Sequence, residues 1–517
     1  MRVLFFVDRP GVLRQFASLV EELAARGHDV HLALRSQPDE DQQPQVERLV
    51  GASPRVTSGP APARGHRDGW RPVAWAVRAV GDLARYSHPR YAHAPTLRAR
   101  VTGKVLDRLD RATELEPLGR RLALRVAHRL AAGDPQLAGG VIRTTAKLER
   151  AIPSSPEIDR YVREQAPDVV LATSVVKLAS PQVEFLKSAR TLRIPAATLV
   201  ASWDNLTNKG LLKWQPERVF VWNEIQRREA IELHGTPPER VTATGAGLFD
   251  TWFDRRPSTS REDFVRAMGL DPERPYVLFL GSSPFVTNHS EDEVRLVERW
   301  VESLRASPDE RVRGVSVVVR PHPVGKGWRD ADLSRFENAV IWPQRSERPV
   351  SAEEHDTFYD SLAHSAAVVG INTTAMIEAA VIGKSVLTVL APEFGQESTL
   401  HFHYLLEQNG GFLHVAATLD EHAEQLARVL EDRAEDAERR RRFVESFVRP
   451  HGLDRPATPI FADAVEALAS EPVEASAHGL LLRPLLAAEA AFAARRLARR
   501  PRRRAGALPA LESRPGP

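Results

Sequence analysis

Short runs of apolar residues alternate with amphipathic segments along most of this 517-residue chain. Residues 2–7 are almost entirely apolar, residues 12–25 place Phe16 and Leu23 on one helical face, and residues 28–34 are largely apolar again. Apolar runs that are separated by helices are typical of parallel strands buried on both faces. The pattern therefore predicts an α/β fold built from β-α-β units.

This alternation of apolar runs and amphipathic segments occurs in two parts of the chain. The predicted strands are residues 2–7, 28–34, 168–173, 196–201, 218–222 and 240–244 in the first part, and 276–280, 315–319, 366–369 and a run from residue 386 in the second. A chain of this length is too long for a single hydrophobic core. We therefore predict two domains, residues 1–250 and residues 271–470.

Two stretches of the first domain do not follow this alternation of strands and helices. Residues 36–65 are rich in Gln, Pro, Ser and Asp, which predicts a mobile loop. Residues 66–150 have a helical pattern in which arginines alternate with aromatic residues such as Trp75 and Tyr86. This stretch is predicted to be a helical, basic insert in the first domain. Its arginines either form a solvated face or contact a phosphate-bearing acceptor or an anionic lipid.

Composition narrows the chemistry that the chain can support. It contains no cysteine, which excludes disulfides, thiol nucleophiles and metal sites that use cysteine ligands. The net charge is only +3, and the basic residues gather in the insert and in the C-terminal tail. No apolar run reaches about 18 residues, and residues 1–7 are too short for a signal sequence. We therefore expect a cytoplasmic protein without a nucleic-acid partner.

The most informative stretch is residues 366–390, which predicts a strand, a turn, a short helix and a second strand. The turn Asn372-Thr373-Thr374 supplies amide and hydroxyl donors where the helix begins, and Glu378 follows one helical turn later. Such donors can hold phosphate, and a carboxylate can accept hydrogen bonds from ribose hydroxyls. The alternative is an ordinary capped helix that packs on the sheet.

This unit resembles the nucleotide-binding helix of GT-B glycosyltransferases and of their relatives, the CDP-glycerol glycerophosphotransferases and the UDP-GlcNAc 2-epimerases. The sequence RGHDVHLAL at residues 26–34 also resembles the opening unit of a GT-B chain. The resemblance covers about residues 1–35 and 155–470. It implies two Rossmann-like domains that face each other across a cleft, and a helix at residues 459–468 that crosses back onto the first domain.

The tetrapeptide Arg320-Pro321-His322-Pro323 resembles the segment that contacts donor phosphate in the glycerophosphotransferases. Proline on both sides of His322 restricts the backbone and projects the imidazole from a strand end, and Arg320 carries a permanent charge suited to a diphosphate. His322 is therefore a candidate catalytic and phosphate-binding residue, or else a structural histidine. The earlier turn at Ser282 and Ser283 is either a phosphate or base contact or an ordinary turn.

Residues 202–210 form a second candidate site, directly after a predicted strand of the first domain. Asp204 is a candidate general base toward an acceptor hydroxyl, while Trp203, Asn205 and Lys209 are candidate substrate contacts. The alternative is a turn in which Asp and Asn bond to their own backbone. Teichoic-acid-type glycerophosphotransferases have Trp-His-Gly in the corresponding place. The Trp-Asp-Asn of this chain departs from that pattern.

The loop that contains His401 and His403 is a further candidate substrate site. Two histidines at this spacing do not share a helix face, and no neighbouring carboxylate completes a set of metal ligands. The Asp330-Ala331-Asp332 sequence lies in a polar stretch beyond its strand. We therefore interpret the histidine loop as sugar-binding, and we expect neither a metal site nor a cofactor beyond the nucleotide-diphosphate donor, which acts as a co-substrate.

The tail at residues 478–517 begins with an amphipathic segment. On a helix, Leu486, Ala490, Ala493 and Leu497 share one face, and arginines fall on the other side. This arrangement predicts a helix that lies on an anionic membrane surface and is followed by a disordered basic end. The alternative is a basic tail that is disordered throughout.

Together these features predict a transferase of the GT-B type that serves polysaccharide biosynthesis at the cell envelope. It would move a glycosyl or polyol-phosphate group from a nucleotide-activated sugar or CDP-glycerol to a glycan or lipid-linked acceptor, at the inner face of the membrane. A nucleotide-sugar 2-epimerase is an alternative enzyme on the same fold. A non-catalytic protein that binds a glycan or organises an envelope complex is the alternative from another class.

Overall fold

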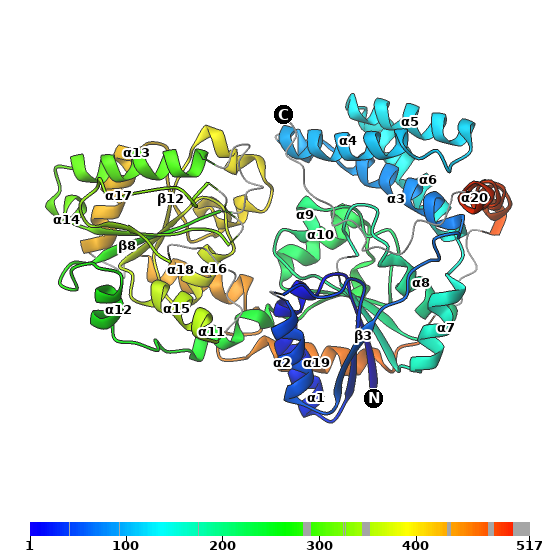
Figure 1. Ribbon diagram of the computed structural model, residues 1–517, viewed down its shortest axis with the longest axis horizontal. Coiled ribbons are helices and arrows are strands. Elements are labelled where there is room, and N and C mark those ends of the chain that lie inside the picture. The colour runs from blue at the N-terminus through cyan, green and yellow to red at the C-terminus, as the bar shows by residue number, and fades with distance from the viewer. Residues whose placement is uncertain are drawn as a thin grey trace.

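The computed structural model of the chain describes residues 1–499 apart from positions 41, 93, 174, 283–290, 324, 326, 344–351, 432–435 and 474–479. Two parallel β-sheets organise these residues, one in each half of the molecule (Figure 1). Hydrophobic clusters lie on both faces of each sheet. The predicted α/β fold with two Rossmann-like domains is therefore confirmed, whereas the predicted boundaries at residues 250 and 271 stay a prediction.

The first sheet has the strand order β3-β2-β1-β4-β5-β6-β7. Its strands are β1 (Arg2–Val7), β2 (Asp29–Leu34), β3 (Val56–Pro60), β4 (Val169–Thr173), β5 (Ala196–Leu199), β6 (Arg218–Val221) and β7 (Val241–Ala243). Strand β1 pairs in parallel with both β2 and β4. The strand order therefore reverses at β1, and ligands of open α/β sheets bind at the carboxyl ends of strands beside such a reversal.

The second sheet has the order β10-β9-β8-β11-β12-β13. Its strands are β8 (Tyr276–Leu280), β9 (Ser316–Arg320), β10 (Ala339–Ile341), β11 (Ala367–Gly370), β12 (Val386–Val389) and β13 (His414–Ala416). Here β8 pairs in parallel with both β9 and β11. The loops that follow β8 and β11 therefore flank the corresponding reversal.

Helices connect the strands. Those of the first half are α1 (Ala17–Ala25), α2 (Gln43–Ala52), α3 (Trp70–Arg85), α4 (Pro95–Asp110), α5 (Pro117–Ala131), α6 (Pro135–Ala151), α7 (Pro156–Gln165), α8 (Val183–Thr191), α9 (Asn205–Asn208), α10 (Glu224–His234) and α11 (Asp250–Asp254). Those of the second half are α12 (Arg261–Ala267), α13 (Asp292–Ala306), α14 (Glu310–Arg313), α15 (Ala352–Ala363), α16 (Ala375–Val381), α17 (Leu419–Glu431) and α18 (Ala437–Phe447). Two later helices, α19 (Ala457–Leu468) and α20 (Arg483–Ala498), pack against the first half. Within the described ranges, no helix combines the length and apolar character needed to cross a bilayer.

Helix α19 returns from the second domain to the first (Figure 1). Its apolar residues join the core beneath the first sheet, where Phe461 meets Phe16 edge-on with ring centroids 6.5 Å apart. The chain thus crosses between the domains twice, and the two crossings are joined where Ala246 N donates to Val448 O at 2.9 Å. The predicted crossing helix is confirmed.

The sequence-based prediction for residues 36–65 was wrong. This stretch contains helix α2 and strand β3, which forms the edge of the first sheet. Val46 and Leu49 of α2 and Val56 of β3 are buried in the core beneath the sheet. Three well-placed apolar side chains are therefore enough to order a segment whose overall composition is polar.

The predicted helical insert is confirmed and consists of α3 to α6 (Figure 1). Its arginines do not form one solvated face, because Arg78 and Arg85 of α3 are buried. Arg78 donates to Ser180 O and to Glu184 of α8, and Arg85 donates to main-chain carbonyls of residues 206–210. These two arginines therefore join the insert to the rest of the first domain.

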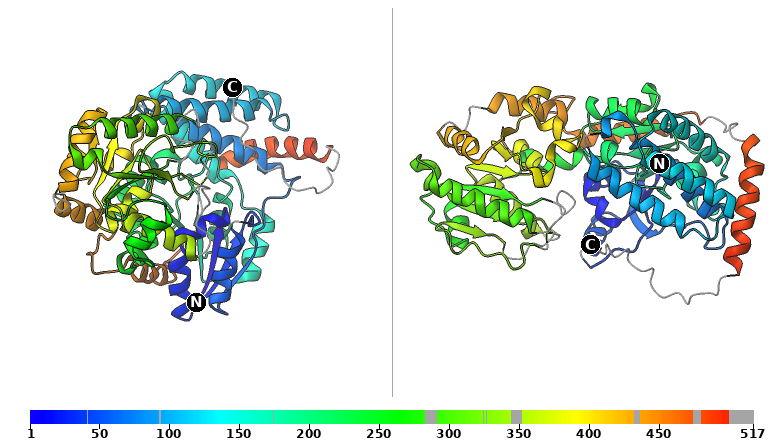
Figure 2. Two further views of the ribbon diagram at one scale, coloured as in Figure 1. Left: turned by 60° about the vertical axis from the view of Figure 1, so that its left-hand side comes forward. Right: turned by 90° about the horizontal axis from the view of Figure 1, so that it is seen from above.

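Helix α20 packs along the insert, at the end of the molecule away from the second sheet (Figures 1 and 2). Ala490 and Ala493 are buried, and Ala490 belongs to the core of the insert. The approach to α3 is so close that a Cβ at Gly69 would lie 1.8 Å from Ala490 O. The apolar face that the sequence predicted to meet a membrane is therefore covered by the protein itself. The predicted disordered end, from residue 500, lies outside the described residues.

Candidate functional site

Two predicted residues meet at the strand-order reversal of the second sheet. Ser282 follows β8, Asn372 follows β11, and Asn372 N donates to Ser282 Oγ at 3.5 Å. The Asn372 side chain donates to Thr399 Oγ1 at 3.1 Å, so the loop of residues 395–405 is tied to the same point. Ser283 lies outside the described residues. The sequence therefore located this loop cluster correctly, as far as the structure describes it.

A buried carboxylate beneath Ser282 was missed by the sequence analysis. Glu293, in the first turn of α13, accepts from Ser282 N at 2.6 Å and from Trp328 Nε1 at 2.8 Å. Burial raises the pKa of Glu293 to about 7, although both N–H donors favour the ionised form. The Ser282 amide and hydroxyl both already have partners, because the hydroxyl contacts the same carboxylate and accepts from Asn372 N.

Arg320 and His322 continue from β9, which neighbours β8. The chain packs tightly there, because a Cβ at Gly281 would lie 2.5 Å from His322 N. The Arg320 guanidinium lies 5.0 Å from the centre of the Phe358 ring, and its buried Nη1 has no hydrogen-bond partner among the described residues. Burial lowers the pKa of Arg320 to about 10. A half-desolvated cation of this kind gains strongly from a nearby anion.

Glu378 lies in the first turn of α16 and is half-buried. Burial raises its pKa to about 7, and the Arg14 guanidinium on η1 (Pro10–Gln15) of the first domain acts in the opposite direction. The carboxyl group is therefore close to half-protonated at neutral pH. Thr373 lies two residues before α16 begins and is half-buried as well.

Thr374 and Trp203 connect the two domains. Thr374 does not cap α16 with its side chain, and its hydroxyl accepts from Trp203 Nε1 at 3.2 Å. The Trp203 ring also meets His401 edge-on, with centroids 4.6 Å apart. Trp203 is 3% exposed, so its indole is covered in this structure. Its predicted stacking on a sugar stays a prediction, while its contact across the domain junction is observed.

Asp204 follows Trp203 at the carboxyl end of β5. Its Oδ1 accepts from Asn205 Nδ2 at 3.0 Å, and its Oδ2 lies 3.6 Å from Lys209 Nζ. Burial acts to raise the pKa of Asp204, but Lys209, His401 and the local hydrogen bonds outweigh it, so the pKa is lowered. No main-chain N–H of α9 donates to this carboxylate, which argues against the alternative of a purely structural Asx turn.

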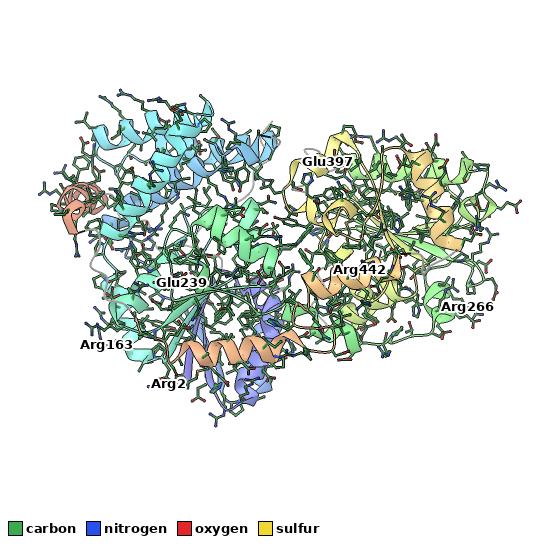
Figure 3. All side chains as sticks on the ribbon, turned by 180° about the vertical axis from the view of Figure 1, so that it is seen from behind. Arg2, Arg163, Glu239, Arg266, Glu397 and Arg442 are labelled. Atoms are coloured by element: carbon green, nitrogen blue, oxygen red, sulfur yellow. The ribbon has the colours of Figure 1, made fainter. Side chains whose placement is uncertain are left out.

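The two predicted histidines have different positions. His401 is buried, accepts from Asn208 Nδ2 at 3.0 Å through its Nδ1, and lies beside Trp203. Burial lowers the pKa of His401 to about 4, so the ring is neutral at physiological pH. His403 instead donates to Glu397 O at 2.8 Å within its own loop. Figure 3 shows Glu397 on the side of the second domain that faces the insert. The structure thus brings His401, but not His403, to the domain junction.

The insert holds the loop that carries Asp204. Arg85 donates to the carbonyls of Lys209 and Gly210, both at 2.7 Å, and also to that of Leu206. Tyr86 and Tyr91 donate to further carbonyls of the same loop. The sequence shows both the arginines and the tyrosines but gives no sign that they point at residues more than 100 positions away.

Among the described residues, no group of three or more His, Asp and Glu side chains is arranged to hold a metal ion. The predicted residues instead form two neighbouring groups. Ser282, Asn372, Glu378, Arg320 and His322 follow strands of the second sheet, and Trp203, Asp204, Lys209 and His401 lie at the junction with the first domain. Thr374 links the two groups through its hydrogen bond with Trp203.

Comparison with solved structures identifies the architecture. A putative UDP-N-acetylglucosamine 2-epimerase from Listeria monocytogenes aligns over 92% of this chain and 98% of its own, with a TM-score of 0.50 and 12% identity. The chain has the GT-B fold. A glycosyltransferase from Rickettsia africae aligns over 91% of this chain and 99% of its own, with a TM-score of 0.50 and 8% identity. No family model matches the sequence. No curated protein matches it either.

Identities this low establish the fold and not the reaction. The fold class that the sequence predicted is therefore confirmed, including the pairing of two Rossmann-like domains. The insert α3 to α6 and helix α20 lie outside residues 1–35 and 155–470, the part of the sequence that resembles GT-B chains.

Proposed function

We propose that the protein is a nucleotide-sugar-dependent transferase that moves a glycosyl or polyol-phosphate group onto a glycan or lipid-linked acceptor, as part of polysaccharide biosynthesis at the cell envelope. The observation that supports this most is an anion-seeking group whose strand flanks the central strand of the second sheet, opposite a strand that leads to a carboxylate. Arg320 ends β9 and has a buried nitrogen without a partner among the described residues, while the half-buried Glu378 lies on the helix after β11. Both strands pair with β8.

In this proposal the second domain binds the donor. Arg320 and His322 contact the diphosphate, and the Ser282, Asn372 and Thr373 side chains add polar contacts. Glu378 accepts hydrogen bonds from the ribose. As the bond to the transferred group breaks, negative charge grows on the diphosphate, and the Arg320 cation stabilises it. Asp204, with Lys209 and Asn205 beside it, acts on the acceptor hydroxyl as general base.

A nucleotide-sugar 2-epimerase is the second candidate, because the Listeria structure with the same fold carries that description. An epimerase needs an acid and a base around a single sugar and no acceptor. Incubation with UDP-GlcNAc alone separates the candidates: an epimerase forms the 2-epimer, whereas a transferase releases nucleotide only after an acceptor is added. Binding without either product would support a non-catalytic role.

Replacing Glu378 by Gln is expected to weaken binding of the donor at pH 8 by tenfold or more. The variant keeps the shape of the side chain but removes the charged acceptor, and a hydrogen bond to a charged group contributes about 1.5–3 kcal/mol. His322→Ala is expected to weaken binding similarly. The measurement is titration calorimetry with the nucleotide sugar that gives the largest thermal shift in a panel that includes CDP-glycerol.

The matched control is Glu310→Gln, which removes an exposed carboxylate on α14 whose ion-pair partner among the described residues is Arg313, at 3.4 Å. Its affinity for the donor should equal that of the wild type. Unchanged affinity in both Glu378→Gln and His322→Ala would remove these residues from the donor site, whereas a loss in the control as well would indicate a general effect of charge.

The affinity for the donor is also expected to depend on pH through Glu378. The pKa of this group is about 7 in the free protein, and the proposed ribose contact requires the ionised form. Binding must then release a proton below that pKa, so affinity should fall by about tenfold per unit as pH decreases below about 7 and level off above it. Among the described residues, the Arg14 guanidinium is a charge that acts on the Glu378 carboxyl and favours its ionised form.

A nucleotide sugar is the ligand for this titration, because its diphosphate carries no proton in this range, unlike the terminal phosphate of a free nucleotide. Glu293 has a similarly raised pKa and contacts Ser282, so the pH dependence must be assigned with a variant. Glu378→Gln should flatten the curve. A curve that keeps its slope in this variant would assign the titration to Glu293 or another group.

A further inference from the structure

Four leucines are strongly exposed, and all lie in two neighbouring segments. They are Leu118 and Leu122 of α5, 70% and 61% exposed, and Leu481 of η9 (Leu480–Leu482) and Leu485 of α20, 95% and 73% exposed. They are the large apolar side chains that stand out in this way among the described residues. Such a grouping is unusual, since exposed apolar residues are normally scattered over a surface. We call these four residues the leucine surface.

The two segments are in contact. Glu489 of α20 accepts from Glu116 N, at the start of α5, at 2.7 Å. A Cβ at Gly119 would lie 3.0 Å from Glu489 Oε2, which places the first turn of α5 directly beside α20. Leu485 is one helical turn before Glu489, and Leu118 is next to Gly119. The leucines of α5 and those of η9 and α20 therefore lie on either side of the same point of contact.

The leucine surface is separate from the packing that holds α20. The other side of this helix supplies Ala490 and Ala493, which are buried against the insert. Figure 2 shows α20 lying along the outer edge of the insert helices. The interior of the insert is thus filled without the four leucines, and no packing requirement accounts for their exposure.

Arginines outnumber acids around the leucine surface. Residues 117–131 of α5 include Arg120, Arg121, Arg125 and Arg129 and no acid, and the Glu116 carboxylate just before them accepts from the amides of Leu118 and Gly119. Residues 483–498 of α20 include three arginines and a single acid, Glu489, which is engaged by Glu116 N. The exposed Arg121, Arg125 and Arg483 lie within about one helical turn of these leucines and make no hydrogen bond or ion pair with any described residue. Unpaired arginines around protruding leucines complement a surface that is anionic outside and apolar just beneath.

We infer that α5, η9 and the start of α20 dock this protein on an anionic lipid bilayer, with the four leucines inserted among the acyl chains and the arginines at the phosphates. A protein partner would need a matching acidic and concave surface. The strongly exposed leucines suit a fluid partner that closes around each of them. The inference stands independently of the proposed reaction, because none of these residues belongs to the candidate site.

The experiment uses the full-length chain and sedimentation with two kinds of vesicle, phosphatidylcholine alone and phosphatidylcholine mixed with phosphatidylglycerol. The wild type is expected to bind the anionic vesicles, and added salt should weaken binding by screening the surface charge. Leu118→Ser/Leu122→Ser/Leu485→Ser should lower the partition coefficient at least tenfold. Because these side chains are exposed, the thermal midpoint should not fall.

A second variant tests the charge. Arg121→Gln/Arg125→Gln should bind more weakly and with a smaller dependence on salt. Its matched control is Arg2→Gln/Arg163→Gln, which removes the same charge from the exposed positions labelled in Figure 3 and should bind as the wild type does. Deletion of residues 478–517 is unsuitable as a test, because it would uncover the part of α3 that Ala490 covers.

Three results would overturn the inference. The leucine variant could bind anionic vesicles as well as the wild type. Binding could be lost on removal of residues 500–517 alone while the leucine variant still bound. Finally, the leucine variant could abolish self-association in solution, measured by ultracentrifugation, without changing vesicle binding, which would identify this face as a contact between copies of the chain.

Discussion

Replacing Glu149 by Gln is expected to lower the free energy of unfolding by about 3–5 kcal/mol, the scale for removing one partner of a buried ion pair. Glu149 of α6 is buried and accepts from two nitrogens of Arg78, at 2.6 and 2.9 Å. It also lies 2.6 Å from Lys187 Nζ of α8. In the variant, Arg78 and Lys187 would stay buried, and the charge of Glu149 that balances them would be gone.

The choice of Glu149 follows from the charges of this cluster. Three buried cations, Arg64, Arg78 and Lys187, pair with the buried carboxylates Glu149 and Glu184 and with the partly buried Asp68. Glu149 contacts two of these cations, Arg78 and Lys187, so its removal leaves an excess of buried positive charge.

The same cluster predicts the behaviour in acid. Burial acts to raise the pKa values of Glu149 and Glu184, but the neighbouring cations outweigh it, and the pKa of Glu184 falls to about 2. A carboxyl group with a lowered pKa stabilises the folded state above its unfolded value and loses that contribution as pH falls toward the folded value. Stability should therefore decline between about pH 4.5 and 2, and less so in Glu149→Gln.

The measurement is urea unfolding followed by circular dichroism, with Glu164→Gln as the matched control. Glu164 is an exposed residue of α7 without a hydrogen bond or ion pair to the described residues, and such substitutions change stability by about 0.5 kcal/mol or less. Equal stability of Glu149→Gln and the control would mean that the insert is joined to the first domain mainly by its apolar contacts.

The two sheets could be predicted because most of their strands are recognisable in the sequence. β1, β9 and β11 are short, continuous apolar runs, and a turn rich in small or polar residues follows each of them. Parallel pairing then brings the ends of β8, β9 and β11 to one edge, so Ser282, Arg320 and Asn372 could be grouped from the sequence alone.

Long-range polar partners could not be predicted in the same way. Arg85 looks like its neighbours in a basic helix, yet its hydrogen bonds reach carbonyls 121 to 125 positions away. Glu293 looks like an ordinary acid in the first turn of a helix, and only the fold brings Trp328 over it. The apolar face of α20 was recognised correctly, but the sequence does not specify whether lipid or protein covers it.

Replacing Asp204 by Asn is expected to lower the rate of transfer by about 10²–10⁴ while donor affinity stays unchanged. The carboxylate lies at the end of β5 in the domain opposite the donor residues, next to Trp203, which contacts Thr374. Asn preserves the size of the side chain. It also disturbs no helix cap, because the Asp204 side chain does not cap α9.

The pH dependence distinguishes this residue from Glu378. The pKa of Asp204 is lowered, so its carboxylate is ionised throughout the neutral range. With the donor at saturation, the ratio of wild-type to Asp204→Asn rates should therefore be the same at pH 6 and pH 8. Asp29→Asn, an exposed residue at the amino end of β2 that pairs with Arg55 at 2.8 Å, is the matched control and should keep the full rate. Full turnover in Asp204→Asn would instead assign this carboxylate to the structure of the loop that Arg85 and the tyrosines hold.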